Sequence, residues 1–67
     1  MKVRNMVKEV RTSLRYSRRL LSRETGVAPL ILRRIEADDG YEPGFRVVRR
    51  ISEVLGRTDL FWIEAIE

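Results

Sequence analysis

The sequence has no cysteine and no histidine, and these absences exclude several kinds of chemistry. Without cysteine there is no disulfide framework, and without either residue the usual zinc sites cannot form. A catalytic system with a cysteine or histidine nucleophile is excluded for the same reason. The acidic residues Glu36, Asp38 and Asp39 do not have the spacing of a calcium-binding loop either. We therefore expect no enzyme activity, no metal ion and no cofactor, and a fold stabilised by a small apolar core.

Long apolar segments are also absent. The longest apolar run, residues 27–32 with Pro29 included, has six residues, far fewer than the roughly 20 of a membrane-spanning helix. The first ten residues lack the apolar stretch of a signal peptide. We therefore expect a soluble, cytoplasmic protein with no membrane partner.

Charge is distributed unevenly along the chain of 67 residues, a length that suits one domain. Residues 1–35 contain ten lysine or arginine residues and two acidic residues, a formal charge of +8. Residues 36–67 contain four arginines and eight acidic residues, a formal charge of −4, so the whole chain has +4. The first half is a candidate for binding a polyanion such as a nucleic acid. A solvated, charge-rich surface on a small helical protein would have the same composition.

Residues 17–36 have the pattern of two short helices joined by a tight turn. Ser17 is a good N-cap for the first of these helices, in which Leu20 and Leu21 are expected to face inward. Gly26 can supply the left-handed residue that closes this helix without a steric penalty from a Cβ atom. The pattern therefore predicts that the first helix ends at the glycine and that the chain turns there.

The second of these helices is expected to begin near Ala28, with Pro29 in the first turn, where a missing N–H costs nothing. Leu32 and Ile35 point toward the core, which leaves the arginines at positions 33 and 34 on the outer face. Two arginines on such a face suggest contacts with phosphate and with guanine. Residues 17–36 therefore predict a DNA-binding helix-turn-helix.

Three further helices are expected from the spacing of apolar residues: from about residue 5 to 15, from about 44 to 55, and from 60 to 66. The positions expected to face the core are Val7, Val10 and Leu14 in the helix near residues 5–15. In the helix near residues 44–55 they are Phe45, Val48, Ile51 and Leu55. No segment alternates with a period of two residues. The sequence therefore predicts an all-α fold, a compact bundle of about five short helices, as a single domain over residues 1–67.

A series of residues between about positions 5 and 61 occurs in the order and at the spacing of a known family. The residues are Val10 and Arg11, Leu21, Gly26 and Val27, Ile35 and Glu36, Pro43, Ile51 and Ser52, and Val54, Leu55 and Gly56. Together they resemble the Cro and phage-repressor type of helix-turn-helix, the XRE-like family. The resemblance implies a lambda-repressor-like domain that binds double-stranded DNA. It also implies a sequence-specific transcriptional repressor of phage or mobile-element type, associated with the nucleoid of a prokaryotic or phage-infected cell.

The resemblance also assigns roles to individual residues. The family's pair between an arginine of the first helix and a glutamate of the third maps to Arg11 and Glu36, a structural ion pair that ties two helices together. The other matched positions are expected to contact DNA from the second and third helices. They are Ser17 and Arg18, with Arg19 beside them, at the phosphates, and Ala28, Pro29, Leu30, Arg33 and Arg34 at the bases.

Apolar residues near the start of the third helix leave two interpretations open. Leu30 and Leu32 lie about 200° apart around a helix, so at least one apolar side chain there is expected to be exposed. An exposed leucine of this kind usually marks an interface. A thymine methyl group and a protein partner would both fit it. The loop that follows is acidic, with Asp38, Asp39 and Glu42 where relatives often have basic or amide residues.

The last predicted helix, within residues 58–67, suggests a homodimer contact. It contains more large apolar side chains than a small monomer buries easily, and such repressors commonly pair two reading heads on a palindromic site. The expected dimerisation residues are Leu60, Phe61, Trp62, Ile63 and Ile66. The alternative is that this helix folds back on the domain.

A second function remains open beside DNA binding. It is a protein-interaction module on the same fold, antitoxin-like or an adaptor, which would dock a protein partner on the exposed apolar residues of the third and last helices. The apolar reading positions and the acidic loop motivate it. A steep fall in DNA affinity with rising salt would count against it.

Overall fold

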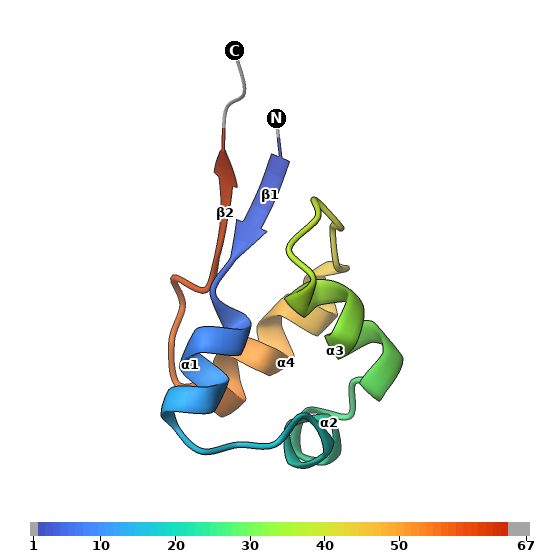
Figure 1. The fold of residues 1–67 in the computed structure, drawn as a ribbon, viewed down its shortest axis with the longest axis vertical. Helices are drawn as coiled ribbons and strands as arrows, with labels where there is room; N and C mark the ends of the chain where they lie inside the picture. The colour runs from blue at the N-terminus through green and yellow to red at the C-terminus, as the bar shows by residue number, and fades with distance from the viewer. Residues whose placement is uncertain (1, 65–67) are drawn as a thin grey trace.

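The structure is a computed structural model that describes residues 2–64, and within that range it contains four helices and a two-stranded sheet. The elements, in chain order, are β1 (Lys2–Asn5), α1 (Val7–Ser13), α2 (Arg18–Thr25), α3 (Pro29–Glu36), α4 (Phe45–Leu55) and β2 (Phe61–Glu64). Figure 1 shows the helices gathered at one end of the molecule and the two strands running side by side away from them. No helix within these residues combines the length and the apolar character that crossing a membrane would need.

Local sequence signals determine the ends of α2 and the start of α3. Ser17 caps α2, and its Oγ accepts a hydrogen bond from the backbone N–H of Leu20 at 3.0 Å. Gly26 ends α2 with φ at 75°, a left-handed conformation that a residue with a Cβ atom adopts only with strain. Pro29 begins α3, where its missing N–H breaks no helical hydrogen bond. These three predictions are confirmed.

The helices enclose a small apolar core. Its buried residues are Val7, Val10, Leu21, Val27, Leu32, Ile35, Ile51, Leu55 and Leu60. Three other residues that were predicted to face inward, Leu14, Leu20 and Phe45, are exposed instead. Leu14 lies beyond the end of α1, and Leu20 is about 100° around α2 from the buried leucine that follows it. Phe45 lies about 120° around α4 from the buried isoleucine at position 51, so its side chain points away from the core.

The predicted last helix is wrong, because the chain there forms β2 instead. β2 pairs with β1 in antiparallel fashion, and the register runs from Lys2 opposite Glu64 to Asn5 opposite Phe61. A run of phenylalanine, tryptophan and isoleucine has high β propensity, and the first strand supplies the hydrogen-bonding partner that a short apolar run cannot reveal by itself. The fold is therefore mostly helical with a small sheet, and not all-α with about five helices. Ile66 of the predicted dimerisation segment lies outside the described residues.

A polar network ties the sheet to the end of α3. Arg4 of β1 donates to Asp38 at 2.9 Å and to Glu64 of β2 at 2.8 Å. Asn5 donates from its Nδ2 to the backbone oxygen of Ile35 at 2.9 Å. Asp38, one of the carboxylates in the acidic loop after α3, is thus an ion-pair partner of β1.

Candidate nucleic-acid interface

The turn between α2 and α3 is held by hydrogen bonds from side chains. Ser22 Oγ donates to the backbone oxygen of Val27 at 2.6 Å. The buried Thr25 donates from Oγ1 to the backbone oxygen of Leu21 at 2.7 Å and accepts from the backbone N–H of Val27 at 3.1 Å. Arg50 of α4 donates from Nε to the backbone oxygen of Thr25 at 3.1 Å. These contacts fix the two helices relative to each other, and none of the three side chains was predicted to position the turn.

The outer face of α3 has an apolar centre between two arginines. Leu32 and Ile35 are buried on the inner face, while Leu30 is 70% exposed. Successive residues of a helix are 100° apart, so Arg33 lies about 60° to one side of Leu30 and Arg34 about 40° to the other. Both arginines are exposed, as are Ala28 and Pro29 at the start of the helix. Leu30, Arg33 and Arg34 therefore share one accessible face, and the exposed Ala28 and Pro29 lie at the start of the helix.

Basic side chains from three helices meet on the Arg33 side of this face. Arg18, Pro29, Leu30 and Arg33 line a surface hollow of about 430 Å³. A neighbouring hollow is lined by Lys8, Arg18, Arg33, Glu36 and Ala37. The structure thus brings the first residue of α2 beside the middle of α3. Exposed Arg19 is also in the first turn of α2, but it lines neither of these two hollows.

Lys8 was missed as a member of this cluster. It lies on α1, three residues before Arg11, and residues three apart share one side of a helix. Because Arg11 reaches Glu36 of α3, Lys8 is brought to the same helix. The predicted Arg11–Glu36 ion pair and the three-residue spacing between Lys8 and Arg11 together indicate that Lys8 lies near α3.

Arg34 lies in a different environment from its neighbour in the chain. Its guanidinium carbon is 4.5 Å from the centre of the Tyr41 ring, a cation–π contact with the loop that follows α3. Tyr41 was not predicted to take part in the site. The stacked ring restricts Arg34, whereas Arg33 faces the cluster formed with α1 and α2.

Arg11 and Glu36 form a nearly buried ion pair behind this surface. Arg11 donates from Nε to Glu36 Oε2 at 2.6 Å and from Nη2 to Oε1 at 3.0 Å. The two side chains are only 9% and 5% exposed. Arg11 also donates to the backbone oxygen of Tyr16 at 2.8 Å. Glu36 has a second cation, because Arg18 Nε lies 3.4 Å from its Oε1, and this carboxylate therefore holds Arg18 against α3.

The predicted dimerisation residues are divided between the core and the surface. Leu60 is 1% exposed and belongs to the core of its own chain, and its backbone oxygen accepts a hydrogen bond from the backbone N–H of Met6. Phe61 is partly buried against the core. Trp62 and Ile63 are exposed on β2.

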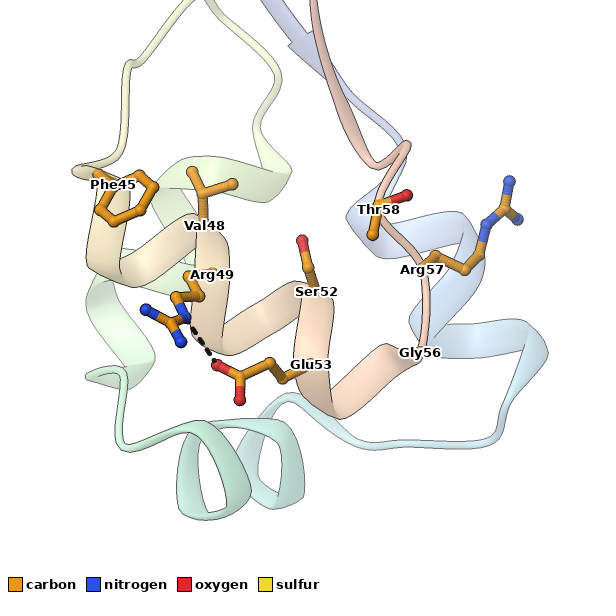
Figure 2. Close-up of a pocket in the computed structure, with 8 residues that line it drawn as sticks. All are labelled: Phe45, Val48, Arg49, Ser52, Glu53, Gly56, Arg57 and Thr58. Carbon is orange, nitrogen blue, oxygen red and sulfur yellow. Dashed lines mark ion pairs between the residues drawn. The ribbon is translucent and has the colours of Figure 1, made fainter.

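A separate hollow of about 410 Å³ lies along α4 and the turn after it (Figure 2). It is lined by Phe45, Val48, Arg49, Ser52, Glu53, Gly56, Arg57 and Thr58, which include none of the predicted DNA-contacting residues. Arg57 donates two hydrogen bonds to Asp59, and these hold the pKa of that carboxyl below its usual value. The hollow has charges of both signs, whereas the charged residues that line the hollow between α2 and α3 are two arginines, Arg18 and Arg33.

A rigid turn between two helices, with the second helix exposing arginines beside the capped start of the first, defines the helix-turn-helix class of DNA-binding domains. The model of the family described as Helix-turn-helix matches residues 7–63. The chain therefore belongs to this family, the XRE, Cro and lambda-repressor type, whose members are DNA-binding and non-enzymatic domains. The resemblance read from the sequence is confirmed, and the protein is a DNA-binding helix-turn-helix regulator. No curated protein and no solved structure matches the chain.

Proposed function

We propose that the protein is a sequence-specific transcriptional repressor, of phage or mobile-element type, that binds duplex DNA with α3 in the major groove. The observation that carries this proposal is the exposed face of α3, where a cluster of Lys8, Arg18 and Arg33 adjoins the base-reading positions. Lys8 and Arg18 would neutralise phosphates, and Arg33 would bind the O6 and N7 atoms of guanine with two hydrogen bonds. The buried Arg11–Glu36 ion pair joins α1 to α3 and supports a fixed orientation of α3 in the domain.

We further propose that two copies bind a palindromic site. Trp62 and Ile63 are exposed on opposite faces of the two-stranded sheet, and an exposed apolar face of this kind can support self-association. A two-fold dimer would present two copies of α3 to half-sites about 34 Å apart, one turn of the duplex. The dimer is tested by measuring the solution mass of the chain and of the Trp62→Ser variant, which we expect to be monomeric at concentrations where the parent is dimeric.

DNA binding is tested by fluorescence anisotropy with duplexes enriched from a random library and with unselected duplexes, over a range of salt concentrations. We expect binding tighter than micromolar, with a logarithmic salt slope of about −2 for each protomer if Lys8 and Arg18 contact phosphate. Arg33→Ala should weaken binding to the enriched duplex by about 1–3 kcal/mol.

Arg49→Ala is the matched control for that variant. Arg49 is also an exposed arginine on a helix, but it lines the hollow along α4. The control should bind DNA like the parent protein. Equal losses for the two variants would refute the assignment of α3 as the reading helix. Weak binding without salt dependence would refute DNA recognition and favour the protein-interaction module.

A further inference from the structure

The exposed face of α3 has an apolar centre formed by Leu30 and Pro29. Leu30 is 70% exposed, and with Pro29 it lines one hollow together with Arg18 and Arg33. An apolar protein segment docked there would have to desolvate both arginines without pairing them, which is unfavourable. The major groove of DNA offers acceptors for the arginines, and the apolar group it presents is the 5-methyl group of thymine.

Resting on the proposed function, we infer that Leu30 and Pro29 recognise a pyrimidine 5-methyl group and that Arg33 recognises a guanine in the neighbouring base pair. Leu30 and Arg33 are three residues apart on α3, which is about 4.5 Å along the helix axis. Neighbouring bases on a strand are about 3.4 Å apart. The two side chains are therefore spaced to contact adjacent base pairs.

Arg34 and Arg18 each have another partner in the structure, so we assign the guanine contact to Arg33. Arg34 is stacked on Tyr41, on the opposite side of Leu30. Arg18 is held by Glu36 at 3.4 Å at the edge of the same hollow, where it would meet the flanking phosphate. The ligand defined by this arrangement is a duplex with a thymine, or a 5-methylcytosine, next to a guanine.

The test replaces single methyl groups on the DNA. The full chain is used to enrich duplexes from a random library, and each thymine of the enriched duplex is then replaced in turn by uracil, which lacks only the 5-methyl group. Dissociation constants are measured by anisotropy at one salt concentration. At the thymine beside the contacted guanine we expect uracil to weaken binding about fourfold, equivalent to about 0.8 kcal/mol for one buried methyl group.

Variants of the protein assign that methyl contact to Leu30. Leu30→Ala should bring the ratio of uracil to thymine dissociation constants at that position to about one. Leu14→Ala makes the same change at a leucine that is 50% exposed after α1 and lines a different hollow, and this variant should keep the fourfold ratio. Circular dichroism of both variants checks that the helices remain intact.

The outcomes separate this inference from the function on which it rests. An enriched duplex without thymine, uracil effects below twofold at every position, or an unchanged ratio in Leu30→Ala would each overturn the methyl contact while DNA binding stands. Failure of the parent protein to bind any duplex in a salt-dependent way would overturn the proposed function itself.

Discussion

Replacing Glu36 by glutamine would remove one carboxylate and leave the Arg11 guanidinium nearly buried without a counter-ion. The two side chains are 9% and 5% exposed and share hydrogen bonds of 2.6 and 3.0 Å. Breaking a buried ion pair by removing one partner typically costs about 3–5 kcal/mol. A glutamine oxygen can still accept one of the hydrogen bonds, so we expect a loss near the lower end, about 3 kcal/mol.

That loss is large beside the whole stability of so small a protein. At about 0.05–0.15 kcal/mol for each residue, a chain of this length has a free energy of unfolding of about 3–10 kcal/mol. A small domain loses roughly 4–8 °C of Tm for each kcal/mol. Glu36→Gln should therefore lower Tm by at least about 12 °C, measured by the helical circular dichroism signal on heating and checked by urea denaturation.

Glu53→Gln is the matched control, because it makes the same chemical change in an exposed pair. Arg49 and Glu53 of α4 lie 3.6 Å apart, with side chains 69% and 53% exposed. An exposed pair of this spacing contributes only about 0.3–0.5 kcal/mol. If Glu36→Gln were no more destabilising than Glu53→Gln, the reasoning from burial would be refuted.

Three other perturbations test separate parts of the structure. Arg18→Ala should weaken enriched and random duplexes alike and reduce the logarithmic salt slope by about 1, measured by anisotropy; a loss confined to the enriched duplex would contradict a phosphate contact. Tyr41→Ala should cost about 0.5–1 kcal/mol in urea denaturation by removing the ring on which Arg34 stacks, whereas Tyr41→Phe, which keeps the ring, should be as stable as the parent; equal losses would argue against the stacking contact. Gly26→Ala should cost about 1–2 kcal/mol in urea denaturation, because φ is 75° while no atom lies within 4 Å of the added Cβ; a much larger loss would indicate a steric conflict.

The predictions that proved wrong share a physical cause. Residues 61–64 form a strand because residues 2–5 pair with them. The spacing of apolar residues within 61–64 does not depend on that distant partner and therefore cannot predict the pairing. Leu14, Leu20 and Phe45 are apolar residues near helix ends or beside the buried stripe. Their exposure depends on where each helix ends and how it is rotated against its neighbours. The pattern of apolar residues predicts neither the last residue of a helix nor its rotation accurately enough to say whether such a side chain is buried.

The helix-turn-helix could be predicted from the amino-acid sequence, because its signals act between residues that are close neighbours in the chain. A serine cap, a left-handed glycine and a proline in a first turn depend only on the backbone within a few residues. The buried stripe of α3 follows from the period of a helix, and the family follows from the order of such signals along the chain.

Which basic side chains lie together depends on how the helices pack against one another. Arg33 and Arg34 are adjacent in the sequence, yet the first joins Lys8 and Arg18 while the second stacks on Tyr41. Their partners come from α1, α2 and a loop, and packing of those elements against α3 places them. Charge acts through distance in space, and separation along the chain does not report that distance.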